Sequence, residues 1–203
     1  DKDLSKIQSA WNYGLRWFGR RSELVLRVNN YFNKNFSLRD RWKSPSKERK
    51  QLISCRVSTS YSRSSVSLSR SMVCKILNEY TNHHPVSYSK FIREMEESLA
   101  VISPFGFGEV CYRDFELVRA GAVCIKQNMD HLETWPNLWQ AESTYIPVKW
   151  DLSDLLPIIE SLHENRGSAA EMAQNAQELY RESLVNQNVK NMFLDRFQES
   201  VNS

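Results

Sequence analysis

The sequence of 203 residues is poor in cysteine, and its four cysteines form neither a C-x-x-C pair nor a cluster with histidine. This pattern favours small buried thiols in a reducing compartment over disulfides or metal ligands. No apolar run approaches the ~18 residues of a membrane-spanning helix, and no signal-peptide pattern opens the chain. We therefore expect a soluble, cytoplasmic protein whose cysteines lie within apolar segments, at Cys55, Cys74, Cys111 and Cys124.

Two motifs of phosphate and metal chemistry are missing as well. The chain contains no G-x-x-x-x-G-K-[ST] sequence, which argues against a P-loop ATPase. No Asp-x-Asp pair for a divalent cation lies within residues 50–186. His83 and His84 are adjacent in a turn-like segment, so their side chains point in different directions. We expect neither a metal site nor a cofactor.

Length and charge limit the organisation of the chain. A chain of this size holds one good-sized domain with appended helices, and such a core needs no covalent cross-links. The net charge is +3, but residues 1–50 carry 13 Lys/Arg against 5 Asp/Glu, which leaves −5 for the other 153 residues. Basic side chains are thus concentrated at the amino end.

The two ends of the chain differ in character from its middle. Residues 1–36 have apolar residues at helical spacing and arginines on the remaining faces, which predicts basic amphipathic helices. Three settings stay open for this segment: an anionic membrane surface, a further domain, or the core itself with the basic face in water. Residues 37–49 are polar, contain Pro45 and are predicted to be a linker. Residues 187–203 are predicted to form a carboxyl-terminal helix.

Residues 50–186 alternate between short apolar runs and segments of helical period. This pattern predicts an α/β fold, a Rossmann-like parallel sheet flanked by helices, with the extra helices at both ends of the chain. The expected strands lie within 51–57, 99–102, 122–125 and 145–148. The expected helices begin after the serine-rich cluster 58–65, at the cap Ser87, after Gly108, at the cap Asp151 or Ser153, and at the capping box Ser168-Ala-Ala-Glu171.

The centre of this pattern is the stretch 103–121, which follows one predicted strand and precedes another. Gly106 and Gly108 permit a ligand to approach the backbone closely, because neither has a Cβ. The amino end of the following helix favours an anion. Candidate ligand-binding residues in the turn are Ser103, Phe105, Gly106 and Gly108.

The helix expected after the turn carries a polar stripe. Glu109, Arg113 and Glu116 are spaced i, i+4 and i+7, so we expect all three on one face of the helix. One interpretation is functional, with the arginine holding phosphate and the carboxylates accepting bonds from sugar hydroxyls. The other is a solvated salt-bridge ladder, which is common and weakly stabilising.

Two further segments follow predicted strands, where an open parallel sheet binds ligands. The serine-rich cluster offers hydroxyl and backbone donors between two arginines, which suits a diphosphate; plain flexibility is the alternative. The candidates there are Arg56, Ser58, Thr59 and Arg63. The polar and aromatic segment 127–143 is either a sugar-binding loop or a cover for the sheet edge. Its candidates are Asp130, His131 and Glu133.

The runs SPFGFGEVCYRDFELVRAGAVCIKQ, HLETWPN and TYIPVKWDLSDL resemble the donor-binding half of GT-B glycosyltransferases. The resemblance is to the family-90 type, related to capsule-associated proteins and protein O-glucosyltransferases, and is strongest over 103–155. It implies one nucleotide-sugar-binding domain, an arginine-rich donor loop near Arg56 and Arg63, and a ribose-binding role for Glu116. Retaining enzymes of that superfamily often carry two glutamates eight positions apart. Glu109 and Glu116 are seven apart, so no stereochemical outcome is carried over.

The resemblance also implies a reaction. It points to metal-independent transfer of a hexose or pentose from a UDP- or GDP-sugar to a hydroxyl of a glycan, lipid or protein. A GT-B enzyme has two Rossmann-like domains and this chain has room for one, so we expect a second, acceptor-binding domain elsewhere. No catalytic base is identifiable in the sequence. Peripheral contact with a membrane stays open, and nucleic acid is not expected as a partner.

A non-enzymatic interaction module is the alternative function. In that case the α/β core is a scaffold, and the basic segment 1–36 binds nucleic acid or an anionic membrane. The aromatic residues of this segment fall on its apolar stripe rather than among the arginines, which favours packing over base stacking. Glycosyl transfer is therefore the leading expectation.

Overall fold

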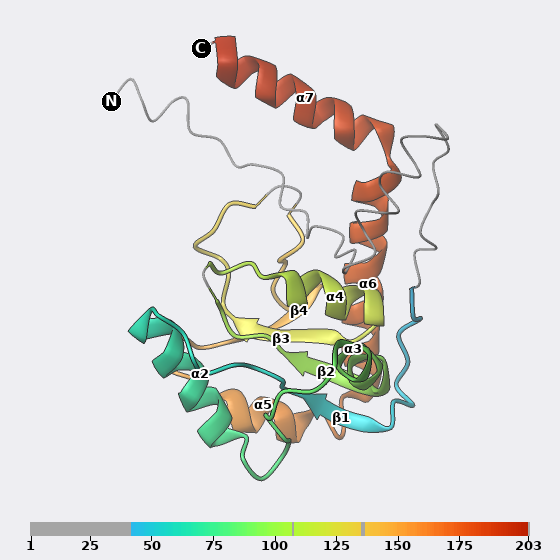
Figure 1. The fold of residues 1–203 in the computed structure, drawn as a ribbon. Coiled ribbons are helices and arrows are strands. Elements are labelled where there is room, and N and C mark those ends of the chain that lie inside the picture. The colour runs from blue at the N-terminus through green and yellow to red at the C-terminus, as the bar shows by residue number, and fades with distance from the viewer. Residues whose placement is uncertain (1–41, 107, 135–136, 203) are drawn as a thin grey trace.

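Four parallel strands form the centre of the protein (Figure 1). The computed structural model describes residues 42–106, 108–134 and 137–202. The predicted basic segment 1–36 therefore lies outside the described residues. The strands are β1 (Gln51–Ser54), β2 (Ser98–Ile102), β3 (Val123–Gln127) and β4 (Tyr145–Val148), and they lie side by side in sequence order. All four lie where apolar runs predicted them, and the α/β, Rossmann-like class of the fold is confirmed.

The two central strands are buried along their whole length. They pair in parallel, with Ala100 opposite Val123 and Ile102 opposite Ile125. Strands covered on both faces read as nearly continuous apolar runs, which is why these two were clear in the sequence. Helices cover both faces of the sheet in Figure 1. They are α2 (Ser64–Ile76), α3 (Tyr88–Glu97), α4 (Tyr112–Ala120), α5 (Leu155–Ser161) and α6 (Arg166–Val185).

Alternate strand residues pack into two separate clusters, one on each face of the sheet. Ala100 and Ile102 join the cluster that α2 and α5 complete, whereas Val101, between them, joins the cluster of α3, α4 and the later part of α6. This alternation follows from the period of two along a strand. Side chains therefore fill both faces of the sheet, and a ligand would have to bind where the strands begin or end.

Helix α6 closes the amino-terminal edge of the sheet, on the side away from the arrowheads in Figure 1. Gln177 Nε2 donates to the carbonyl of Val118, close to the end of α4, and Asn175 Nδ2 donates to the carbonyl of Ser143, just before β4. Arg49, from the segment before β1, adds bonds from Nη2 to the carbonyls that precede β3, at Ala120 and Gly121. A ligand would therefore bind at the opposite, carboxyl-terminal edge of the sheet.

Helix α4 begins later than predicted, and this corrects the position of Glu109. The carboxylate of Asp114 accepts the backbone N–H of Cys111 at 2.8 Å, so Cys111 is the N-cap and the first helical residue is Tyr112. Glu109 lies before the helix and does not continue the stripe of Arg113 and Glu116. The expectation of three residues on one helix face is therefore wrong.

Two other caps also differ from the predictions. Asp154, rather than Asp151 or Ser153, takes the N-cap position of α5. Helix α6 starts at Arg166 with Asn165 as its cap, so the box Ser168-Ala-Ala-Glu171 lies inside the helix. Arg166 Nη2 donates to the carbonyl of Arg49, which fixes the first turn of α6 against the segment before β1.

Helix α7 (Gln187–Asn202) follows α6 and extends away from the sheet in Figure 1. It agrees with the helix expected at the carboxyl end. Among the described residues, no helix combines the length and apolar character needed to cross a lipid bilayer.

Candidate functional site

The candidate site is the carboxyl-terminal edge of the sheet. In an open parallel sheet, the segments that follow the strands meet at this edge, and ligands bind there. Three of these segments hold sequence-predicted candidates: residues 55–63 after β1, 103–111 after β2 and 128–144 after β3. The structure thus brings three groups of candidates to one edge, although Arg113 and Glu116 lie on α4 behind it.

Arg70 of α2 connects two of these segments. Its Nε donates to the carbonyl of Phe105 at 2.9 Å, and its Nη1 donates to the hydroxyl of Tyr61 at 3.0 Å. A weaker bond of 3.3 Å joins Nη1 to the carbonyl of Ser58. Only 3% of Arg70 is exposed, yet its contacts in the described part of the chain are neutral groups rather than a carboxylate. A buried cation without an anionic partner is costly, which makes Arg70 a candidate ligand for an anion.

Arg70 was not among the residues predicted from the sequence. It occupies the apolar side of α2, where the other buried residues are Val66 and Val73. An arginine in an apolar stripe, four residues after one valine and three before another, is the signal that marks it.

The two glycines of the central turn have different roles. A Cβ on Gly106 would lie 3.1 Å from Arg70 Nη2 and 3.2 Å from the sulfur of Cys111, so glycine lets the arginine approach the turn. A Cβ on Gly108 would meet no atom within 4 Å. Close packing therefore explains Gly106, and Gly108 is open to its surroundings.

A buried ion pair lies beneath the turn. Lys126 Nζ is 3.1 Å from the carboxylate of Asp114 and donates to the carbonyl of Ser103 at 3.2 Å. The hydroxyl of Ser103 donates to the other oxygen of the same carboxylate. Burial lowers the pKa of Lys126, but the Asp114 carboxylate, together with Cys124 and Cys111, more than offsets this, and the pKa lies above its ordinary value.

This ion pair changes the expectation about the amino end of α4. The Asp114 carboxylate, which accepts the N–H of the N-cap residue Cys111, already places a negative charge at the positive end of the helix dipole. A ligand anion at this edge would therefore depend on the arginines more than on the helix. The sequence did not single out Lys126 or Asp114 for any role.

Arg113 and Glu116 both face α3. The Nε and Nη1 atoms of Arg113 are buried without a hydrogen-bond partner in the described part of the chain, and its guanidinium lies 6.0 Å from the ring of Phe91. Glu116 Oε1 accepts a hydrogen bond from the hydroxyl of Tyr88 at 3.1 Å. Within the described ranges, Arg113 and Glu116 form no ion pair with each other, so the predicted salt-bridge ladder is not formed.

Burial affects the ionisation of Glu116. It raises the pKa of this carboxyl, and the hydrogen bond from Tyr88 and the charge of Arg113 offset only part of that rise. The pKa of Tyr88 itself is raised to about 12, by burial first and then by the Glu116 charge.

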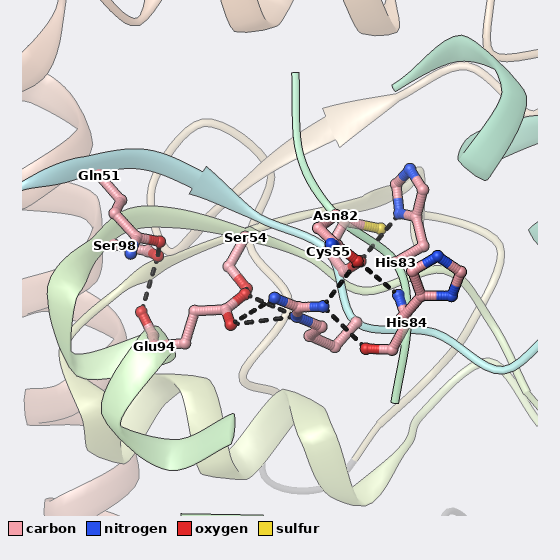
Figure 2. A network of polar contacts seen from close by, with 9 residues as sticks. Gln51, Ser54, Cys55, Asn82, His83, His84, Glu94 and Ser98 are labelled. Carbon is pink, nitrogen blue, oxygen red and sulfur yellow. Dashed lines mark hydrogen bonds and ion pairs between the residues drawn. The ribbon is translucent and has the colours of Figure 1, made fainter. Parts of the chain in front are cut away.

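Arg56 is occupied by protein groups. Its guanidinium lies 3.0 Å from the Glu94 carboxylate, and its Nη1 donates to Asn82 Oδ1 and to the carbonyl of His84. Figure 2 shows Glu94 with Ser54, whose hydroxyl donates to the same carboxylate at 2.7 Å. This network ties the end of β1 to α3 and to the turn before it.

The remaining candidates after β1 lie at the surface. Ser58, Thr59 and Arg63 are exposed. The carbonyls of the first two accept bonds from Arg70 and Ser67, respectively, so the backbone of this segment is fixed although its side chains reach solvent.

Three rings from different segments meet at the other half of the edge. The rings of Phe105 and Trp150 have centroids 5.5 Å apart, and those of His131 and Trp150 are 5.4 Å apart. We call these three residues the aromatic shelf. Trp150 lies two residues after the end of β4 and is 47% exposed, and it was not predicted from the sequence. Its position just beyond a predicted strand was the available signal.

Two acidic candidates lie in the segment after β3. Asp130 accepts a bond from Asn128 Nδ2 at 2.8 Å, and its own N–H donates to Asn128 Oδ1. Glu133 forms an ion pair of 3.1 Å with Arg196 of α7, and 74% of its side chain is exposed. Among the described residues, no group of three or more His, Cys, Asp and Glu side chains is arranged to hold a metal ion.

The parallel sheet and its flanking helices define the chain as an α/β protein of Rossmann-like fold. Comparison with models of known protein families finds no match, and comparison with curated proteins finds none either. The function of this site is therefore argued from its residues.

Proposed function

We propose that the carboxyl edge binds the diphosphate of a nucleoside-diphosphate sugar, and that this domain is the donor-binding part of a glycosyltransferase. The observation that carries the proposal is the pair Arg70, which contacts the glycine turn, and Arg113, which lies in the first turn of the helix that follows it. The hydrogen bonds of Arg70 go to neutral groups, and two nitrogens of Arg113 have no hydrogen-bond partner among the described residues.

Both arginines come from elements next to the turn, Arg70 from α2 and Arg113 from the first turn of α4. Burial raises the pKa of the Cys111 thiol, and the charges of both Arg113 and Arg70 offset part of that rise. A Cβ on Gly106 would lie 3.1 Å from Arg70 Nη2 and 3.2 Å from the Cys111 sulfur, so Arg70 reaches the turn beside Cys111, and Arg113 follows Cys111 by two residues. A diphosphate at this place would gain charge-assisted, bidentate hydrogen bonds from guanidinium groups.

The same arrangement supports a role in transfer. Cleavage of the bond between sugar and diphosphate leaves a developing negative charge on the leaving group, and positioned guanidiniums stabilise that charge. Glu116 supports ribose binding, because a carboxylate has about four acceptor positions and only one hydrogen bond, from Tyr88, is formed to it in the described chain. The acceptor hydroxyl and its base are assigned to a second domain.

Calorimetry of the whole chain with UDP, GDP and their sugar conjugates tests this function. We expect one diphosphate to bind, and Arg70→Met and Arg113→Met each to weaken it by about tenfold, since each removes charge-assisted hydrogen bonds. Arg93→Met, an exposed arginine on α3, is the matched control and should leave the affinity unchanged. Absence of binding at millimolar ligand would overturn the proposal.

A further inference from the structure

We propose that the aromatic shelf of Phe105, His131 and Trp150 binds the sugar ring of the donor and that Trp150 is its main contact. This inference rests on the function proposed above and deepens it. The shelf draws one ring from each of the segments after β2, β3 and β4. Their contact holds Trp150 in place while nearly half of its surface remains exposed at the edge where ligands bind.

The order of the strands separates the shelf from the nucleoside end of the ligand. Glu116 bonds Tyr88 of α3, and α3 packs against β1 and β2. The glycine turn follows β2, and Trp150 follows β4. With the ribose at Glu116 and the diphosphate at Gly106, the sugar attached to the diphosphate extends toward β4. Two strand spacings amount to about 10 Å, which is the scale of a phosphate group plus one sugar ring.

The chemistry of the shelf also suits a sugar. One face of a pyranose carries C–H bonds with partial positive charge, and an indole face carries the negative part of the ring quadrupole. Polar groups lie beside the rings, because Asp130 directly precedes His131 and its carboxylate is oriented by Asn128. A flat apolar surface with hydrogen-bond acceptors at its margin suits a sugar ring, because the faces of the ring are apolar and its edge carries hydroxyls.

The inference is tested by comparing each bare diphosphate with its sugar conjugates. The probes are UDP with UDP-glucose, UDP-galactose, UDP-xylose and UDP-N-acetylglucosamine, and GDP with GDP-mannose. For the conjugate that the parent binds most tightly, Trp150→Ala should weaken binding by about fivefold or more, a loss of one ring-stacking contact. The affinity for the bare diphosphate should stay within about twofold, because the charged contacts remain.

Two further variants are the controls for this result. Trp150→Phe keeps an aromatic face and should recover most of the lost affinity for the conjugate. Tyr80→Ala, which removes an exposed aromatic side chain on the segment after α2, should change neither affinity. Equal losses of affinity for the diphosphate and its conjugate would place the shelf at the nucleoside. No loss of affinity for either ligand would show that the shelf is not part of the site. Both results overturn this inference alone, whereas a parent chain that binds no diphosphate overturns the proposed function.

Discussion

Glu116 joins α4 to α3 through a single hydrogen bond, and this allows its proposed binding role to be separated from its structural role. Tyr88 is 45% exposed, so its hydroxyl can turn to water when the carboxylate is removed. We predict that Glu116→Ala weakens nucleotide binding by at least about tenfold, from the loss of charge-assisted bonds to ribose. The free energy of unfolding should change by less than about 1 kcal/mol. An unchanged affinity, measured by calorimetry, would contradict the ribose assignment.

The raised pKa of Glu116 adds a pH dependence to the same prediction. Ribose hydroxyls donate to the ionised carboxylate, so binding should weaken on acidification at a pH above the ordinary glutamate range. Glu116→Gln should bind weakly and without this step. In the free chain the sign is opposite: a carboxyl whose pKa is raised by folding stabilises the fold at acid pH, and this contribution is lost as the pH rises.

Lys126 and Asp114 are buried partners, 1% and 0% exposed. Lys126→Met leaves an unpaired carboxylate in the core, so we predict a loss of about 3–5 kcal/mol in the free energy of unfolding. Urea unfolding at neutral pH measures it. Glu133→Ala breaks the surface pair with Arg196 and serves as the control, with an expected change of about 0–1 kcal/mol. Similar losses in both variants would contradict the structural role given to Lys126.

At the scale of elements, the end of α4 shows why one glycine cannot be replaced. Gly121 caps the helix in the left-handed region, with φ of 72°, and a Cβ there would collide with the carbonyl oxygen of Lys43. Gly121→Ala should therefore cost more than the 1–2 kcal/mol or so of the left-handed conformation alone.

Gly167, near the start of α6, is the matched control for this variant. A Cβ at Gly167 would meet no atom within 4 Å, so Gly167→Ala should stabilise the protein by about 0.5–1 kcal/mol. Thermal unfolding of the two variants beside the parent checks both signs. A neutral Gly121→Ala would show that the segment 42–50 does not pack against the end of α4.

The strands and helices were predictable from the sequence, whereas several helix caps were not. Apolar runs and helical periodicity depend on burial, which the sequence pattern records directly. Caps depend on a few local contacts. The bond from Cys111 N–H to Asp114 sets the start of α4 beyond Glu109, whereas α6 starts at Arg166 without a side-chain cap bond from Asn165, and the box that begins at Ser168 lies inside the helix. Local patterns such as a serine followed by a glutamate identify possible caps, but the packing of the helix decides which one is used.

At the scale of the whole molecule, the sequence predicted which segments meet at the carboxyl edge of the sheet but missed several side chains of the candidate site. Arg56 matched the pattern of a phosphate ligand, but Glu94, 38 residues away, holds its guanidinium. Arg70 looked like part of an apolar helix face, and it reaches the turn at Phe105. Such contacts between distant segments follow from how the loops pack, and no local spacing encodes them. Trp150 belongs to the same class, since its neighbours come from two other segments.

The most direct measurement is a crystal structure of the whole chain with the diphosphate that calorimetry selects. We predict phosphate oxygens within hydrogen-bond distance of the guanidiniums of Arg70 and Arg113, beside Gly106, with a ribose hydroxyl on the carboxylate of Glu116. A diphosphate bound elsewhere, with these three side chains unoccupied, would contradict the central claim that the carboxyl edge of this sheet is the donor site.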